Sequence, residues 1–357
     1  MAKTYGSLFP RIYDFQALHD AYCRARAGKR DRPEVQRFEQ DLEGNLIELQ
    51  NELIWGTYRT GEYRTFEIHE PKARRVAALP FRDRVVQHSL VAVIEPIWEA
   101  RFVHDSYACR PGRGTHRGAD RAQQMLRQVK RRHGRVVVLK GDVKSYFASI
   151  DHAILKRLLR RRIRCARTLA LLDQIIDSSN QINATPGVGL PIGNLVSQLA
   201  ANIYLHELDA FVKHELREKH YVRYMDDFVI VHHDKAHLHA VRERIDRFLG
   251  DRLRLQTNAK TQIYPVGLLR GRSLDFLGYQ MWPTHRRMRR SSIVRISRTL
   301  RKLQRLYERG QIGLDRVRAS VQSWLAHAAH ADARGLCARL LGGVAFRRGN
   351  ADAPAQP

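Results

Sequence analysis

Two adjacent carboxylates, Asp226 and Asp227, lie between two short runs rich in β-branched and aromatic residues. The runs, Tyr221-Val222 and Phe228–Val231, predict two strands, which places both acids at the tip of a hairpin. Adjacent carboxylates repel each other, and burying them without compensation is costly. A divalent cation would remove this conflict, although an Asp-Asp pair alone is also typical of an ordinary turn or of a solvated helix start.

A third acid, Asp142, follows the apolar run Val136–Leu139, which predicts a buried strand. One acid at a strand end and two at a hairpin tip form the arrangement used for two-metal phosphoryl or nucleotidyl transfer, in which ions about 3.5–4 Å apart bind the attacking and leaving oxygens. Mg²⁺ suits such a site because it takes a few carboxylates and fills its other positions with water and substrate phosphates. The three acids therefore predict two bound Mg²⁺ ions, for which Mn²⁺ could substitute.

Seven segments of the chain resemble, in their order, the motifs of reverse transcriptases. They are Arg74-Arg75 with Phe81–His88, Ser106–His116, Asp142–Phe147, Gly189–Gln198, Tyr224–Asp227, Leu255–Lys260 and Phe276–Tyr279. The first two resemble the fingers motifs, the next four the motifs of the palm, and the last the primer grip. Any one match alone is unspecific, whereas seven in one order are specific.

This resemblance implies an α+β fold of the right-hand polymerase type, with fingers, a palm built on an antiparallel sheet and helices, and a short helical thumb. The expected boundaries are residues 1–135 for the N-terminal helices and fingers, 136–290 for the palm, and 291–346 for the thumb. A fingers segment is expected near 153–190, and residues 347–357 are expected to form a disordered tail. No repeat or low-complexity linker interrupts this plan.

Apolar spacing predicts the main helices and strands around these motifs. One helix is expected from Val35 to Leu53 and another from Asp151 to Arg164, and a strand is expected to begin at Leu253. A strand pair is expected over residues 63–79, and the Asn-, Gly- and Pro-rich stretch 180–191 reads as a loop. Two amphipathic helices are expected in the thumb, with basic residues on their outer faces.

The resemblance also assigns roles at the nucleotide site. It implies nucleotide contacts from Lys72, Arg74, Arg75, Arg110, Phe147, Ile192 and Gln198. Charge-assisted donors of the basic residues suit triphosphate oxygens, and the ring of Phe147 would exclude a ribose 2′-hydroxyl, which predicts a preference for dNTPs. Ordinary surface charge is the alternative for each basic residue, and core packing is the alternative for Phe147.

Roles in catalysis follow from the same resemblance. Asp142, Asp226 and Asp227 would bind the metal ions, assisted by the backbone carbonyl of Val143. Lys260 would protonate the leaving pyrophosphate, general acid catalysis worth about 10²–10⁴-fold, with simple charge screening as the alternative. The primer grip is implied at Phe276, Leu277, Gly278 and Tyr279.

One departure from the common motif indicates a subfamily. Most reverse transcriptases have Gln where this chain has Ile192, and an apolar side chain cannot hydrogen-bond the sugar or base. The pattern Leu190-Pro-Ile-Gly-Asn194 with Ser197-Gln198 is similar to that of the reverse transcriptases of diversity-generating retroelements, which copy a template-repeat RNA with errors at adenines. The Trp282–His285 run and Tyr107–Pro111 are also similar to that subfamily. In the alternative, Ile192 merely fills space.

Two further functions stay open at this point: a stand-alone or phage-defence bacterial reverse transcriptase with the same motifs, and an RNA-binding scaffold without polymerase activity. The 357 residues carry a formal net charge of +27, which favours a polyanionic partner such as an RNA template or a primer–template duplex. The subfamily usually works with a small basic accessory protein. No apolar run approaches about twenty residues, and the N-terminus shows no signal-peptide core, so a cytoplasmic enzyme without membrane contact is expected.

Overall fold

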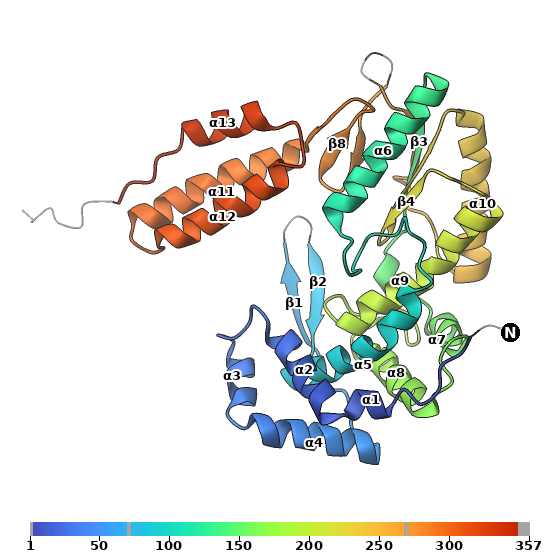
Figure 1. Cartoon of the computed structure of the whole chain (residues 1–357), viewed down its shortest axis with the longest axis vertical. Helices are drawn as coiled ribbons and strands as arrows, with labels where there is room; N and C mark the ends of the chain where they lie inside the picture. The colour runs from blue at the N-terminus through green and yellow to red at the C-terminus, as the bar shows by residue number, and fades with distance from the viewer. Residues whose placement is uncertain (1–2, 70–72, 268, 270, 349–357) are drawn as a thin grey trace, which may run out of the picture. The chain divides into compact units, whose positions relative to one another are not determined.

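The computed structural model describes residues 3–69, 73–267, 269 and 271–348. These residues divide into two compact units (Figure 1). The first unit comprises residues up to Gly114 together with Lys140–Val229 and His239–Thr261, and the second comprises Thr115–Leu139, Ile230–Leu238 and the residues from Gln262 onward. Each unit is described separately.

Five helices make up the N-terminal part of the first unit. They are α1 (Pro10–Tyr13), α2 (Phe15–Arg26), α3 (Pro33–Glu39), α4 (Leu42–Trp55) and α5 (Phe81–Glu99). The single helix predicted from Val35 to Leu53 is therefore wrong, because the chain breaks between α3 and α4. Asp41 causes the break, since its side chain accepts a hydrogen bond from the Gly44 N–H at 3.1 Å and caps the new helix.

An antiparallel hairpin and three further helices complete the fingers-like part of this unit. Strands β1 (Arg64–Ile68) and β2 (Arg74–Ala78) pair with Arg64 opposite Ala78. The helices are α7 (His152–Arg160), α8 (Ala166–Ser178) and α9 (Leu195–Ala210), which continues as a π-helical turn, Phe211–Glu215. The predicted helix over 151–164 ends earlier, at Arg160, and α8 was not predicted.

A four-stranded sheet has the order β4-β5-β3-β6. Its strands are β4 (Tyr221–Tyr224), β5 (Asp227–His232), β3 (Val137–Asp142) and β6 (Gln262–Pro265), and β3 and β5 each run through residues of both units. Helix α10 (Lys235–Leu253) follows β5. The strand predicted to begin at Leu253 is wrong, since Leu253 ends α10 and only Thr257 makes an isolated bridge, to Val143.

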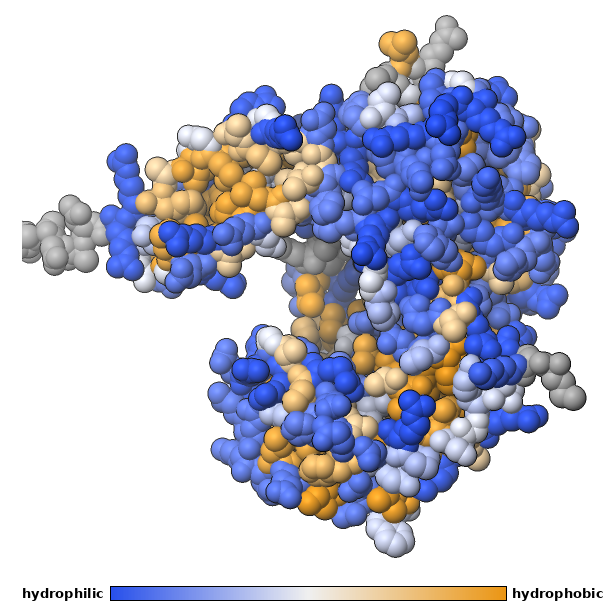
Figure 2. Space-filling model, in the orientation of Figure 1, coloured by the Kyte–Doolittle hydropathy of each residue, from blue (hydrophilic) through white to orange (hydrophobic). Residues whose placement is uncertain are grey.

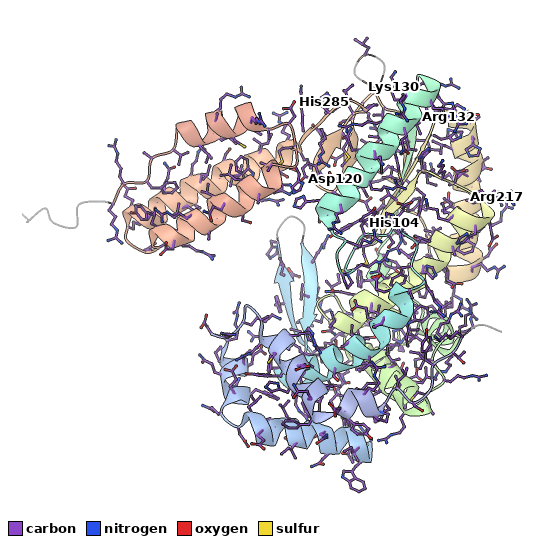
Figure 3. The ribbon with its side chains drawn as sticks, in the orientation of Figure 1. His104, Asp120, Lys130, Arg132, Arg217 and His285 are labelled. Carbon is purple, nitrogen blue, oxygen red and sulfur yellow. The ribbon has the colours of Figure 1, made fainter. Side chains whose placement is uncertain are left out.

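The second unit combines one long helix with a small antiparallel sheet. Most of the exposed residues of helix α6 (Thr115–His133) are basic, among them Lys130 and Arg132, and Asp120 is an exposed acid of the same helix (Figure 3). The sheet has the order β7-β8-β9, with β7 at Leu274–Phe276, β8 at Tyr279–Met281 and β9 at Arg286–Met288. Gln123 of α6 donates to the Trp282 carbonyl and so joins the helix to the sheet.

Three C-terminal helices, α11 (Arg290–Glu308), α12 (Leu314–Ala328) and α13 (Arg334–Gly342), end the described chain. The first two match the predicted thumb helices, whereas α13 was not predicted and none of its residues is fully buried. Apolar side chains gather over these helices in Figure 2. Residues 349–357 of the predicted tail lie outside the described residues. Within the described chain, every helix is too short or too polar to span a bilayer.

Candidate active site

The two adjacent acids lie at a tight hairpin, as the sequence predicts. Strand β4 ends at Tyr224 and β5 begins at Asp227, so Met225 and Asp226 alone connect the two paired strands. Met225 has φ +57°. This left-handed conformation costs a residue other than glycine about 1–2 kcal/mol, so contacts from the surrounding structure must stabilise it.

The third acid, Asp142, is the last residue of β3, the strand next to β5. The N–H of the following residue, Val143, donates to the Asp226 carbonyl at 3.2 Å. Burial and then the negative charge of Asp142 raise the pKa of the Asp226 carboxyl above its ordinary value, while Arg74 lowers it. The negative charge of Asp142 therefore acts electrostatically on the Asp226 carboxyl.

The remaining acid of the trio has a cationic neighbour. The Nζ of Lys140 lies 3.9 Å from Oδ1 of Asp227, and both side chains are about one-third exposed or less. At this distance and exposure the ion pair is weak, with less than about 1 kcal/mol expected. The Lys140–Asp227 contact therefore contributes little to stability.

The segment after α10 holds the backbone of Asp142 through two hydrogen bonds. The Asn258 N–H donates to the Asp142 carbonyl at 2.7 Å, and the Asp142 N–H donates to the Thr261 hydroxyl at 3.4 Å. Lys260 lies between these two supports and its side chain is exposed, while its N–H donates to Oδ1 of Asn258. Lys260, the predicted general acid, thus lies in the loop that hydrogen-bonds to Asp142 at the end of β3.

Three predicted nucleotide-site segments are joined by backbone hydrogen bonds. The Ala77 N–H of β2 donates to the Ile192 carbonyl at 3.0 Å, and the Leu190 N–H donates to the Phe147 carbonyl at 2.7 Å. Gly193 has φ +121°, and a Cβ there would lie 3.0 Å from Val76 and 3.2 Å from the Ala77 carbonyl. Glycine therefore lets the Ile192 loop approach the β2 strand closely.

The other predicted nucleotide-site residues lie in different settings. Arg74 and Arg75 are exposed on β2, and Gln198 lies half-buried in the first turn of α9. The Arg110 side chain is only 4% exposed, and its nitrogens donate to the Glu99 carboxylate and to the carbonyls of Val103 and Ser106. Its contacts are thus to protein groups. Lys72 lies outside the described residues.

The predicted primer-grip residues belong to the second unit. Leu277 and Gly278 connect β7 to β8, with φ +52° and +86°, and Phe276 pairs with Tyr279 across the turn. The Tyr279 hydroxyl lies 3.0 Å from Nδ1 of His116 and donates to the His327 carbonyl at 3.0 Å. The primer-grip hairpin is therefore anchored to α6 and α12.

Sequence reasoning missed Arg223, which lies two residues before Met225. Arg223 is completely buried, as is its ion-pair partner Asp209. Burial by itself would lower the pKa of the guanidinium, but the charge and hydrogen bonds of Asp209 raise it above its ordinary value. The signal in the sequence was an arginine inside an otherwise apolar strand, since a buried arginine needs a partner.

The chemistry of the donor set fits a divalent cation. Burial raises the pKa of the Asp226 carboxyl first and the negative charge of Asp142 raises it further, and a bound cation would offset both effects. Across the described part of the chain, no group of three or more His, Cys, Asp or Glu side chains converges as a ready metal cluster. Asp142, Asp226 and Asp227 are the carboxylates that would hold a divalent cation here.

Comparison with known proteins agrees with this geometry. The profile of the family described as Reverse transcriptase (RNA-dependent DNA polymerase) matches residues 68–281. Protein YkfC of Escherichia coli K12 is 31% identical over 272 residues, which cover 65% of this chain and 70% of that protein. The group II intron-encoded protein LtrA of Lactococcus lactis is 25% identical over 317 residues, which cover 69% of this chain and 50% of LtrA.

The chain therefore belongs to the reverse transcriptase family, and the prediction of an RNA-directed DNA polymerase is confirmed. A solved structure of apo telomerase from Candida tropicalis, truncated from its C-terminal domain, matches with a TM-score of 0.50 and 12% identity over 68% of this chain and 59% of the other. That likeness concerns the fold alone and confirms the predicted α+β class with the right-hand polymerase arrangement. This chain spans about half the length of LtrA and 70% of YkfC.

Proposed function

We propose that this chain synthesises DNA from dNTPs on a template-repeat RNA and copies its adenines inaccurately, so that the cDNA diversifies a target gene. The single observation that carries the polymerase activity is the backbone hydrogen bond from Val143, the residue after Asp142, to the carbonyl of the hairpin acid Asp226. The adenine-specific errors are supported by Ile192, whose loop lies against the strand that carries Arg74 and Arg75. We expect the enzyme to act in the cytoplasm with a small basic accessory protein.

Each residue of the site has a defined task in this proposal. Mg²⁺ bound by Asp142, Asp226, Asp227 and the Val143 carbonyl would stabilise the negative charge that develops on the reacting phosphate. Arg74 and Arg75 bind the triphosphate, and the position of Lys260 on the supporting loop lets it donate a proton to the leaving pyrophosphate. The primer grip at Phe276–Tyr279 holds the primer end, and Phe147 excludes ribonucleotides.

A second candidate function is favoured by the comparisons. The relatives include a group II intron-encoded protein, LtrA, which is 25% identical to this chain over 317 residues. In this alternative the chain is a reverse transcriptase of the group II intron-related type that copies its template uniformly, and Ile192 only packs. A stand-alone or phage-defence role would give the same enzymatic behaviour.

The experiment is primer extension on an RNA template with adenines at fixed positions, using Mg²⁺ and all four dNTPs, followed by sequencing of the cDNA. We expect misincorporation concentrated opposite adenine, and we expect Ile192→Gln to reduce it because glutamine restores a hydrogen-bonding side chain. Ile47→Gln, at an exposed isoleucine of α4, is the matched control and should leave the error spectrum unchanged.

Uniformly accurate cDNA from the wild type would support the second candidate instead. RNA binding without any synthesis, in the presence of a full dNTP supply and a basic accessory protein, would favour the scaffold. An unchanged error spectrum in Ile192→Gln would contradict the role of Ile192.

A further inference from the structure

The β4–β5 hairpin has a buried support, Arg223, in its own first strand. Met225 takes up a left-handed conformation without being glycine, and it directly precedes Asp226. Arg223 donates from Nη1 to the Met225 carbonyl at 2.8 Å. This hydrogen bond joins the buried Arg223 side chain to the backbone of the strained residue, Met225.

The guanidinium that makes this bond is held on its other edges. Nε and Nη2 donate to the two carboxylate oxygens of Asp209 at 2.7 and 2.6 Å, and Nη2 also donates to the Ser106 hydroxyl at 3.0 Å. Asp209 in turn accepts from the Tyr221 hydroxyl at 2.6 Å. A planar guanidinium bound on two edges is fixed in direction, unlike a lysine ammonium.

Two separate parts of the first unit therefore meet at this one side chain. Asp209 lies in α9, and Ser106 lies in the segment before α6. That segment is also bound to the backbone of Arg223, because the Arg223 N–H donates to the Asp105 carbonyl at 2.9 Å and the Tyr107 N–H donates to the Arg223 carbonyl at 3.0 Å. Strand, helix and segment fix the base of the hairpin together.

We propose that Arg223 is a positioning residue, which fixes the left-handed turn at Met225 and so directs the Asp226 carboxylate toward Asp142. The metal-binding role of Asp226 in this assignment rests on the proposed polymerase function. The geometry of the turn does not. Arg223 does not contact substrate in this role, and it acts through the Met225 carbonyl and the backbone that follows.

The central test is Arg223→Lys, which keeps the positive charge but cannot bind Asp209 and the Met225 carbonyl at the same time. Arg160→Lys is the matched control, since Arg160 also makes a two-point ion pair, with Asp173, and a carbonyl bond, to Lys156, but lies in α7. Ser106→Ala is a milder variant, which removes a single acceptor from Arg223 in case Arg223→Lys does not fold.

The readouts are hydrogen exchange of residues 221–232 and of the Val143 amide, the Mg²⁺ concentration for half-maximal synthesis, and kcat separately from KM for dNTP. We expect Arg223→Lys to exchange faster at these amides, to need more Mg²⁺, and to lower kcat by about 10²-fold while KM stays near the wild-type value. Ser106→Ala should change the same quantities in the same direction but less. Arg160→Lys should change none of them.

The possible outcomes separate the two proposals. A wild type that synthesises DNA, with Arg223→Lys and Ser106→Ala both matching Arg160→Lys in exchange, Mg²⁺ requirement and kcat, would overturn the role of Arg223 alone. A wild type without synthesis would contradict the proposed function, and hydrogen exchange at Val143 would still decide the role of Arg223. Equal acceleration of exchange in Arg160→Lys would show a general loss of stability and would also overturn the proposal.

Discussion

Two hairpins of this chain have equally short connections, but different interactions stabilise their turns. Each connects two short strands through only two residues: Met225-Asp226 between β4 and β5, and Leu277-Gly278 between β7 and β8. Both connections need left-handed backbone, at Met225 in the first and at Leu277 and Gly278 in the second. The second has a glycine for this purpose, whereas the first has none.

The difference lies in what stabilises each turn. Gly278 adopts φ +86° without steric cost, although its neighbour Leu277, at φ +52°, is left-handed without being glycine, as Met225 is. The Met225 carbonyl accepts a hydrogen bond from Arg223, a completely buried residue that pairs with Asp209 of α9. The β7–β8 turn is thus favoured in part by its local glycine, while the β4–β5 turn, which carries two of the predicted catalytic acids, is held by a side chain fixed through tertiary contacts.

The strongest test of this contrast removes an acid from each hairpin. Asp226→Ala should lower synthesis by about 10³-fold or more, because a lost ligand removes several kcal/mol of charge stabilisation, while primer–template binding stays near the wild-type level. Primer extension and a filter-binding assay measure the two quantities. Asp275→Ala, in β7, removes a carboxylate that pairs with Arg289 and should keep most of the synthesis. Comparable losses in both variants would contradict the difference between the hairpins.

A smaller effect is expected from Gly278→Ala. An alanine forced to φ +86° should lower the free energy of unfolding by about 1–2 kcal/mol, measured by urea denaturation. The control is Gly335→Ala in the first turn of α13, where the backbone is helical and nothing lies within 4 Å of the added Cβ, so the free energy of unfolding should not fall. If Gly278→Ala is neutral, local sequence does not specify the β7–β8 turn.

The first hairpin can be converted to the second kind by Met225→Gly. Because glycine adopts the left-handed turn unaided, Arg223→Lys should cost less in this background than in the wild type, by about 1 kcal/mol of coupling energy. Hydrogen exchange of residues 221–232 in the two single variants and the double variant gives that energy. Strict additivity would show that Arg223 and Met225 act independently and would weaken the contrast.

The smallest expected effect concerns protonation of the Asp226 carboxyl. Burial and the charge of Asp142 raise the pKa of Asp226 above 3.8, so metal-free enzyme takes up this proton as the pH falls through the raised value. Mg²⁺ affinity should therefore weaken at a higher pH than an ordinary aspartate would cause, and metal-free stability should decrease as the pH rises from 3.8 through the raised value.

Asp142→Asn removes the second cause of that shift and should lower the pKa of Asp226, while burial keeps it above the ordinary value. Carboxyl ¹³C NMR of the metal-free protein measures the pKa directly. Asp173→Asn, at an acid paired with Arg160 instead, is the control and should leave it unchanged. An unmoved Asp226 resonance in Asp142→Asn would show that the two carboxylates do not interact.

Much of the candidate site could be predicted from the sequence because its signals are local. The hairpin around Asp226, the apolar strand that ends at Asp142, and the β7–β8 turn at Gly278 all follow from patterns of a few neighbouring residues. The helix break at Asp41 is also local, but it was missed because apolar spacing continued across it. The strand predicted at Leu253 was wrong because α10 extends to that residue.

The sequence by itself indicated the reverse transcriptase family and predicted the strand end at Asp142 and the hairpin at Asp226 and Asp227, since each depends on residue types at short spacing. Only the tertiary structure showed that Arg110 binds Glu99, that Lys140 neighbours Asp227, and that Arg223 supports the catalytic turn. Asp209 and Arg223 are fourteen positions apart in the sequence, the first in helix α9 and the second in strand β4. A buried charge finds its partner through the fold, and no local pattern specifies which one it will be.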